Sequence, residues 1–325
     1  MPAFSTMESP VFDYGTVVQA LGESVKRNLT DGLLLSGLDT AILAHLASKW
    51  VKPDCITVAL QGAPAPDVDY AKLVASRLEL KHYVHYFGDD ELDEGIRAAI
   101  RIMKSFDPME IRNSAAIYVA LKVGRDEGIS TIMTGDGCDE LFVGYSFFFG
   151  LAKEQLDIAL KKLWTNMRFS SMYLAKELGL EVRLPFMDSQ FKAFATALDV
   201  GLKVRSERGQ VWGKWVLRKA FENIISPEIA WRAKAPIEVG TGTTILPSLF
   251  DSRISDLEFN QKKMRYLNDD SVVIRSKEHL FYYEIYRDVI GVPYATDSKA
   301  KSCPDCGTSV EEATSFCRTC GAYPI

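Results

Sequence analysis

The chain lacks a long apolar run and an excess of basic charge. No stretch approaches the roughly 18–20 consecutive apolar residues that a membrane-spanning helix needs. Its first ten residues lack the basic and apolar segments of a secretory signal. The 38 Lys and Arg are outnumbered by 43 Asp and Glu, which gives a net charge of −5. Such a chain offers no membrane segment and no basic surface for nucleic acid, so neither partner is expected.

Cysteine is scarce and clustered, with six residues in 325. Four of them form two C-x-x-C pairs near the C-terminus, Cys303 with Cys306 and Cys317 with Cys320, each followed by glycine. Four thiolates in two such knuckles are typical of a closed, tetrahedral zinc ribbon, in which the glycines allow sharp turns around sulfur. The pattern predicts structural Zn²⁺ in a reducing, cytoplasmic compartment rather than a disulfide framework. We expect this ribbon to contribute little to chemistry and to dock on a protein partner.

The first half of the chain alternates short apolar runs with segments of helical spacing. Strands are predicted at residues 33–35, 56–60, 82–86 and 129–133, with amphipathic helices between them. This alternation indicates right-handed crossovers and a doubly wound parallel sheet of the α/β class. From about residue 153 the strand signals stop and helices are predicted at 155–167, 191–198, 212–224 and 277–289. The predicted domains are therefore 1–296, a sheet domain with a helical lobe, and 297–325, the zinc ribbon.

Two predicted strands end at small, polar turns that contain glycine and aspartate, Ser36–Thr40 and Thr134–Glu140. Parallel sheets bind ligands at the turns that follow the carboxyl ends of their strands. The first turn offers backbone N–H groups and a hydroxyl at a helix N-terminus, which suit phosphate oxygens. Asp136, Asp139 and Glu140 in the second turn are oxygen ligands suited to Mg²⁺. Together the turns predict a site for a nucleotide and a metal ion.

These turns and a third segment resemble the signatures of the N-type ATP pyrophosphatases, the PP-loop superfamily with its adenine nucleotide alpha hydrolase-like fold. Within that group the chain is similar to the synthetase half of the asparagine synthetases. Their Ser-Gly-Gly-x-Asp-Ser stands here as Ser36–Thr40, one glycine short. Their acidic signature, which ends in Phe-Gly-Gly-Tyr, stands as Thr134–Tyr145 with Val143 for one glycine. Their Val-Glu-x-Arg-x-Pro-Phe-Leu-Asp stands as Leu180–Asp188.

The resemblance implies an ATP- and Mg²⁺-dependent ligase that forms amides. In the family a carboxylate, aspartate, attacks the α-phosphorus of ATP, and a nitrogen nucleophile then displaces AMP from the acyl-adenylate. Catalytic roles are implied for Asp136, Lys214 and Asp39, with Asp136 standing where the family has a glutamate base. The Mg²⁺ is implied at Asp39 and Asp139. Nucleotide contacts are implied for Leu35, Ser36, Gly37, Asp39, Thr40, Leu60, Thr134 and Gly135.

Several positions refine or weaken the resemblance. Pro2 stands where full-length asparagine synthetases carry the cysteine nucleophile of a glutaminase domain. We therefore expect nitrogen from ammonia, another amine or a separate glutaminase subunit. Lys234 and Arg112 match further family positions, although Ala235 replaces the usual glutamate after Lys234. Because Gly37 is the only glycine of this signature, we expect the chain to bind the ATP phosphates weakly and the adenine base normally.

Two other functions remain open from the sequence. One is an RNA-thiolating or other adenylating PP-loop enzyme, because that branch often carries zinc knuckles. It would need a basic surface and a reactive cysteine, and among the cysteines near the nucleotide turns only Cys138 could serve. Cys138 also fits a small buried apolar position, which we favour. The other is a catalytically weak nucleotide-binding homologue that acts through its zinc ribbon.

Overall fold

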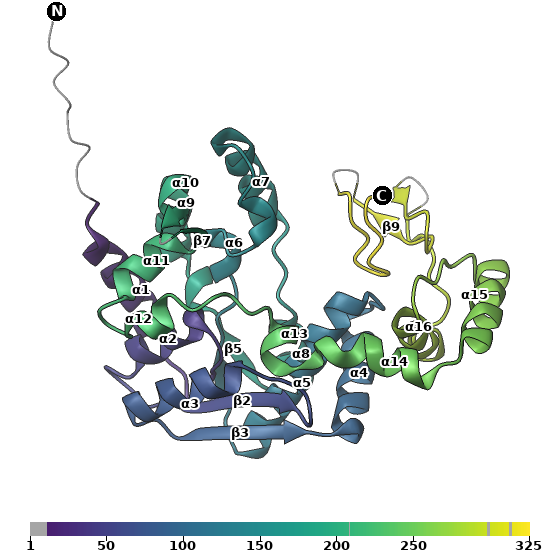
Figure 1. Ribbon diagram of the computed structural model, residues 1–325, viewed down its shortest axis with the longest axis horizontal. Helices are drawn as coiled ribbons and strands as arrows, with labels where there is room; N and C mark the ends of the chain where they lie inside the picture. Colours follow the sequence, from purple (N-terminus) through teal and green to yellow (C-terminus); the bar gives the residue numbers. More distant parts are fainter. Residues whose placement is uncertain (1–11, 208, 298–299, 312–313) are drawn as a thin grey trace, which may run out of the picture.

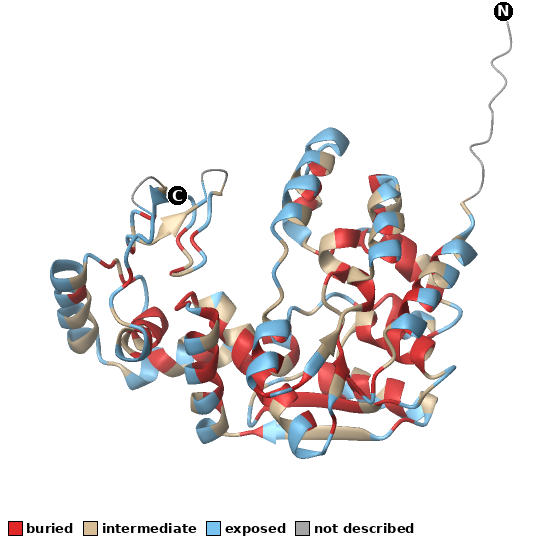
Figure 2. Cartoon of the chain, turned by 180° about the vertical axis from the view of Figure 1, so that it is seen from behind, coloured by how far each residue is buried: buried red, intermediate tan, exposed pale blue. Residues whose placement is uncertain are grey.

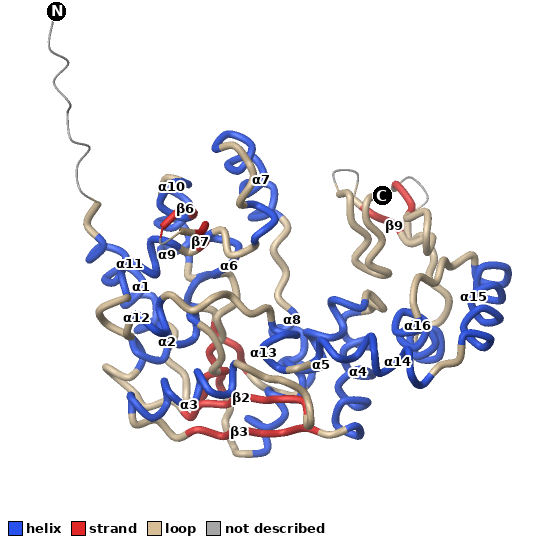
Figure 3. Tube along the Cα trace, in the orientation of Figure 1, coloured by secondary structure: helices blue, strands red, loops and turns tan. Residues whose placement is uncertain are grey.

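The structure, a computed structural model, describes residues 12–207, 209–297, 300–311 and 314–325; Pro2 lies outside this part of the chain. Its centre is a five-stranded, all-parallel sheet in the order β3-β2-β1-β4-β5 (Figures 1 and 3). The strands are β1 (Gly32–Leu34), β2 (Asp54–Leu60), β3 (His82–Phe87), β4 (Thr131–Met133) and β5 (Glu181–Arg183). The prediction of an α/β fold with a parallel sheet is confirmed.

Helices cover both faces of the sheet, so the central strands are buried on both sides (Figure 2). Ile56 and Val58 of β2 face one core and Cys55, next to them, faces the other, as the period of two in a strand requires. A near-continuous apolar run of this kind is the mark of a doubly covered parallel strand. The first core contains α4 (Asp89–Met103), α5 (Pro108–Asp126) and α8 (Ser170–Glu177); the second contains α1 (Tyr14–Arg27), α2 (Leu38–Ala47) and α3 (Asp67–Leu78).

The region after residue 153 is less purely helical than predicted. β5 completes the edge of the main sheet beside β4, and β6 (Val204–Glu207) pairs with β7 (Gln210–Gly213) in an antiparallel hairpin. The predicted helix 212–224 therefore begins only at Trp215, as α11 (Trp215–Phe221). The remaining elements up to α12 are α6 (Cys138–Phe142), η1 (Ser146–Phe148), α7 (Lys153–Thr165), η2 (Pro185–Met187), α9 (Ser189–Ala197), α10 (Val200–Lys203) and α12 (Pro227–Ala230).

The C-terminal elements lead from the sheet to the cysteine module. They are α13 (Ile237–Thr241), η3 (Thr243–Ile245), α14 (Leu246–Arg253), α15 (Asp256–Asp270), α16 (Lys277–Val289), β8 (Lys301–Ser302) and β9 (Ser309–Val310). The ribbon lies against the start of α5 and against α16, and its four cysteines belong to the same buried cluster as Phe106 and Tyr286 (Figure 1). Within the described residues, no helix combines the length and the apolar character needed to cross a bilayer.

Candidate active site

The turn after β1 passes directly into α2. Leu35 still belongs to the sheet, because its amide donates to Ile56 O at 2.8 Å. Gly37 is the N-cap residue of α2, with φ −97°, so the turn does not use the left-handed region that favours glycine. The hydroxyl of Thr40 closes the turn by accepting from Ser36 N at 2.8 Å and donating to Gly37 O at 3.3 Å. The first amides of α2, which have no helical acceptor, form a site for an anion.

The turn after β4 packs against this first turn. A Cβ added to Gly135 would lie 3.1 Å from Asp39 Cβ and 3.2 Å from Thr40 Cγ2, so any side chain here would push the two turns slightly apart. The two motifs that are almost a hundred residues apart in the sequence therefore form one site at the carboxyl edge of the sheet. The sequence-based prediction that they act together agrees with this placement.

Asp136 is enclosed by hydroxyl groups. Thr134 Oγ1 donates to Asp136 Oδ2 at 2.8 Å, and Ser171 Oγ of α8 donates to the same oxygen. Burial raises the pKa of Asp136, and the two hydroxyl donors only partly oppose it. A buried carboxyl group with a raised pKa can accept or hold a proton near neutral pH. No motif of the sequence pointed to Ser171, which lies in the helix α8 outside all three motifs.

Lys214 lies between two carboxylates from the two turns. Its Nζ is 2.6 Å from Asp39 Oδ2 and 2.7 Å from Asp139 Oδ1, and Lys234 Nζ is 2.9 Å from the same oxygen of Asp139. Burial disfavours the Lys214 ammonium, but Asp139 and Asp39 outweigh it and raise its pKa. Burial likewise disfavours ionised Asp139, but Lys214 and Lys234 outweigh it and lower its pKa. Lys214 and Asp139 therefore stay charged, and the carboxylates of Asp39 and Asp139 converge on one cation.

The backbone holds Lys214 in an uncommon conformation. It is the N-cap residue of α11, with φ 56° and ψ 26°, and its amide donates to Phe142 O at 2.7 Å. Gly213 touches the carbonyl of Val143, where no side chain would fit. Val143 itself has φ 57°, in the left-handed region that a β-branched residue rarely adopts. The end of the β6–β7 hairpin and the end of α6 thus brace each other and hold Lys214 over the carboxylates, at the cost of backbone strain.

Two donor sets of the chain fit metal ions. Mg²⁺ is commonly held by one or two carboxylates together with substrate phosphates, and Asp39 and Asp139 already converge on a cation beside an anion site. The four sulfurs of the cysteine cluster all lie within 4.8 Å of one another and are buried. Four thiols so arranged fit one tetrahedral Zn²⁺, as predicted. Each knuckle is closed by an amide: Gly307 N donates to Cys303 O and Gly321 N to Cys317 O.

Arg232 is a site residue that the sequence analysis missed. Its Nη1 donates to Ser36 O at 3.4 Å, it pairs with Asp67, and its guanidinium lies 4.0 Å from the centre of the Tyr70 ring. A buried arginine beside the phosphate turn adds positive charge where phosphates are expected. The only signal for it was its position two residues before Lys234. Arg112 lies elsewhere, in an ion pair with Glu278 at 3.2 Å.

Residues 16–178 and 173–295 match the family model described as asparagine synthase. The chain belongs to the asparagine synthase family. The resemblance drawn from the three motifs is thereby confirmed.

Curated relatives in the asparagine synthase family support the same assignment. The chain is 27% identical over 326 residues to asparagine synthetase B [glutamine-hydrolyzing] of Escherichia coli (strain K12), covering 90% of this chain and 57% of the relative. It is 29% identical over 265 residues to asparagine synthetase [glutamine-hydrolyzing] 1 of Arabidopsis thaliana, covering 74% of this chain and 44% of the relative. The chain thus spans about half the length of the curated relatives it matches.

Two solved structures show only a remote likeness to this member of the asparagine synthase family. One is an NH3-dependent NAD synthetase from Campylobacter jejuni, with a TM-score of 0.31, 19% identity and coverage of 47% of this chain and 74% of that one. The other is NMN synthetase from Francisella tularensis, with a TM-score of 0.30, 13% identity and coverage of 70% and 99%. Likenesses this low do not bear on function.

Proposed function

We propose that this family member is an ATP-dependent ligase that adenylates a carboxylate and transfers nitrogen to it, with release of AMP and pyrophosphate. Aspartate is the carboxylate that we propose. The observation that carries the proposal is the bridge from Lys214 to Asp39 and Asp139. It brings the phosphate turn, the acidic turn and a charged ammonium to one point. Departure of pyrophosphate needs positive charge at that point, because charge develops on the leaving group.

In this proposal the charged groups share the work on the phosphates. Lys214 and Lys234 face the departing pyrophosphate and stabilise its negative charge, and Arg232 adds charge from the other side of the turn. Asp39 and Asp139 would hold Mg²⁺, which when bound neutralises phosphate charge. The first amides of α2 position the phosphate oxygens. The nucleotide contacts implied for Leu60 and Thr134 remain part of the proposal.

For nitrogen transfer we assign Asp136 as the group that accepts a proton from the incoming amine. Its carboxyl group is buried, has a raised pKa and is oriented by Thr134 and Ser171. We propose ammonia, another amine or a separate glutaminase subunit as the nitrogen source. Outside the ribbon, the cysteines Cys55 and Cys138 are fully buried, so neither offers a thiolate for glutamine hydrolysis. If a glutaminase subunit supplies ammonia, the ribbon is the surface on which we expect it to dock.

The compartment we propose is the cytoplasm. None of the six cysteines is paired in a disulfide, and burial raises the pKa of Cys55 to about 12. Unpaired cysteines in such number are typical of a reducing environment.

Exchange of radiolabelled pyrophosphate into ATP tests the proposal. The full chain is incubated with MgATP, labelled pyrophosphate and one carboxylate from a panel that includes aspartate, with and without ammonium. Aspartate-dependent exchange, with amide formed only when ammonium is added, is the expected result. Lys214→Met is the matched inactive control, and Lys176→Met, an exposed lysine of α8, should exchange like the parent. If no carboxylate of the panel supports pyrophosphate exchange although the chain binds ATP, the chain is instead a weak nucleotide-binding homologue.

The RNA-thiolating alternative fits the geometry less well. Cys138 is fully buried and its thiol donates to Asp39 Oδ1 at 3.2 Å. Burial and the neighbouring Asp39 raise the pKa of Cys138, so the thiol stays protonated rather than reactive. Cys138→Ala should therefore keep pyrophosphate exchange within about three-fold of the parent, since only a weak hydrogen bond is removed. A loss of all activity in this variant would restore the thiolation hypothesis.

A further inference from the structure

The second knuckle of the ribbon holds the residues that precede α5. Phe106 N donates to Thr319 O at 2.7 Å, and Ser105 Oγ donates to Arg318 O at 2.8 Å. Both acceptors lie between Cys317 and Cys320, inside the C-x-x-C loop. The conformation of this loop is the one that a bound metal fixes, because both of its sulfurs bind the ion.

The first knuckle holds the residues that precede α16 in the same way. Val273 N donates to Asp305 O at 2.8 Å, and Arg275 pairs with the Asp305 carboxylate at 2.6 Å. Asp305 lies between Cys303 and Cys306. Arg275 also donates to Cys320 O, so it ties the two knuckles together. Each knuckle therefore grips the segment just before a helix.

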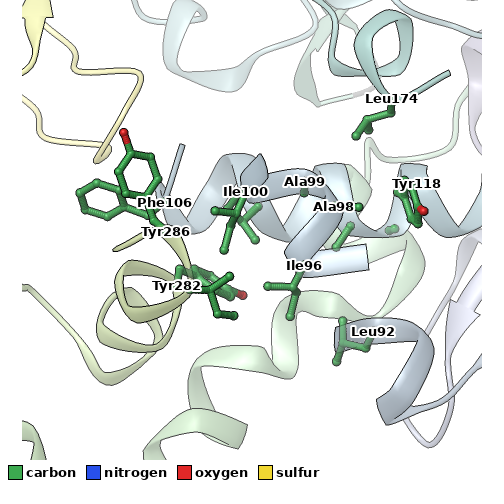
Figure 4. Close-up of a cluster of buried hydrophobic side chains, with 14 of the residues drawn as sticks. Leu92, Ile96, Ala98, Ala99, Ile100, Phe106, Tyr118, Leu174, Tyr282 and Tyr286 are labelled. Atoms are coloured by element: carbon green, nitrogen blue, oxygen red, sulfur yellow. The ribbon is translucent and has the colours of Figure 1, made fainter. Parts of the chain in front are cut away.

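The two helices that the ribbon grips contact each other near their N-terminal ends. Arg112 of α5 pairs with Glu278 of α16 at 3.2 Å, and both side chains are largely buried. The Phe106 ring, at the start of α5, lies 5.0 Å from the Tyr283 ring and 4.9 Å from the Tyr286 ring of α16 (Figure 4). The ribbon, the first turn of α5 and the first turn of α16 thus form one packed unit.

This unit reaches the ligand-binding edge of the sheet. α5 leads into the parallel strand β4, so its first turn lies at the carboxyl edge, where such sheets bind ligands. Thr243 Oγ1 donates to Arg112 O at 3.5 Å. The neighbouring Gly242 packs on Ala63, in the loop after β2. The backbone of Arg112 therefore lies near the rim of the site, while its side chain pairs with Glu278, away from the groups that face the phosphates.

We propose that the zinc ribbon is a clamp that fixes the first turns of α5 and α16, so that metal loading sets the position of Arg112 and with it the affinity for the acyl substrate. The second half of the inference rests on the proposed function; the first half does not. Without metal the two C-x-x-C loops lose their common anchor, because structural zinc supplies much of the folding energy of such modules. The carbonyl groups that hold Ser105 and Phe106 then lose their fixed positions. Between the described residues of the ribbon and the nucleotide groups after β1 and β4 there is no contact of this kind.

The experiment compares the full chain with and without zinc by amide hydrogen exchange, and adds two variants. Ser105→Ala removes the hydroxyl that donates to Arg318 O and accepts from Asp107 N at 3.1 Å, and it leaves the metal ligands intact. Ser302→Ala, at an exposed position of the ribbon strand β8, is the matched control. We expect zinc removal to speed amide hydrogen exchange in residues 109–113 and 277–281, and Ser105→Ala to speed it in residues 109–113, by about five- to thirty-fold, the factor for one or two hydrogen bonds. Exchange in α2 should not change, and Ser302→Ala should match the parent.

Steady-state kinetics with aspartate and MgATP complete the test. Ser105→Ala should raise KM for aspartate by about five-fold, the factor for one hydrogen bond, with KM for MgATP unchanged. If the rate of amide hydrogen exchange at residues 109–113 is unchanged in both the zinc-free chain and Ser105→Ala, the clamp proposal is overturned. Equal loss of protection in α2 would also overturn it, by showing a general folding role. If no carboxylate supports turnover, the proposed function fails, and the amide hydrogen exchange still shows whether the ribbon acts as a clamp.

Discussion

Lys214 Nζ lies 2.6 Å from Asp39 Oδ2 although 175 residues separate the two in the chain. The contact joins the phosphate turn after β1 to the N-terminus of α11, and the same ammonium reaches Asp139 of the acidic turn at 2.7 Å. All three side chains are largely buried. A buried ion pair is weak evidence for stability in itself, but removing one partner leaves a charge uncompensated.

Lys214→Met tests this bridge. Methionine keeps the length of the side chain and removes the charge, so Asp39 and Asp139 lose their shared cation. We expect the free energy of unfolding at pH 7 to fall by about 3–5 kcal/mol, with pyrophosphate exchange abolished. Lowering the pH should reduce the difference, because a buried carboxylate that has lost its cation takes up a proton more readily than a paired one. Urea unfolding at pH 7 and pH 5 measures it, and a loss under ~1 kcal/mol would contradict the bridge.

The sequence was informative where local pattern and motif coincide. The strands at 56–60 and 82–86 and the helix at 277–289 were predicted closely, because β2 is a long apolar run, β3 is rich in aromatic residues that favour strands, and α16 has clean helical spacing. The two nucleotide turns were also expected to act together. That expectation followed from a rule about parallel sheets rather than from any single residue.

The sequence failed where tertiary contacts decide the conformation. β5 has only three residues, with charged Glu181 and Arg183 at its ends, and it is a strand because it completes the sheet edge beside β4. Lys214 was predicted inside a helix, whereas packing against the end of α6 holds it at φ 56°. The partnership of Arg232 with Ser36 and Asp67 is non-local, so no spacing in the sequence could reveal it.

A pH-dependent test concerns Lys203, a buried lysine of α10. Its Nζ has no hydrogen-bond partner among the described residues and lies 4.7 Å from the centre of the Trp164 ring. Burial lowers the pKa of Lys203 to about 8. Between that value and its unfolded pKa, the unfolded chain binds more protons than the folded chain, so this lysine adds stability as the pH rises.

Lys203→Met removes that titration. The free energy of unfolding of the variant minus that of the parent should be larger at pH 7 than at pH 10, by about 2–3 kcal/mol. Urea unfolding at both pH values gives the difference. Lys162→Met, an exposed lysine of α7, is the control and should show no such dependence. If the difference is the same at both pH values, Lys203 is not a buried charge.

Val143 offers a test of backbone strain beside the site. It is fully buried and has φ 57°, and it stands where the family signature has glycine. Val143→Ala and Val143→Gly both lose the buried side chain, but only glycine relieves the left-handed conformation. We therefore expect the glycine variant to be the more stable of the two by about 1 kcal/mol. Val25 is buried within the helix α1 and serves as the control. There we expect Val25→Ala to be more stable than Val25→Gly by about 1 kcal/mol. Thermal or urea unfolding of the four variants measures these stabilities. If alanine is the more stable replacement at both positions, the backbone at Val143 is not strained.

The last prediction concerns the shortened phosphate turn. Two of its amides are already used, since Leu35 N donates to Ile56 O and Ser36 N donates to Thr40 Oγ1. A glycine inserted between Gly37 and Leu38 adds one backbone donor and one residue that can adopt positive φ. One hydrogen bond to a charged group is worth about 1.5–3 kcal/mol, so ATP affinity and exchange rate should rise by about ten-fold or more. AMP affinity should stay within about two-fold, because the adenine side is untouched and AMP lacks the β- and γ-phosphates.

An alanine inserted at the same site is the matched control for this turn. It adds the same amide but resists positive φ, so it should recover less of the gain than glycine does. Equilibrium binding of AMP and ATP and the rate of pyrophosphate exchange are measured for the parent and both insertions. A one-residue insertion also tends to rotate the following helix by about 100°. If the glycine insertion lowers all three quantities, the register of α2 matters more than the extra donor. The short turn, closed by Thr40, would then be an adapted part of a working site.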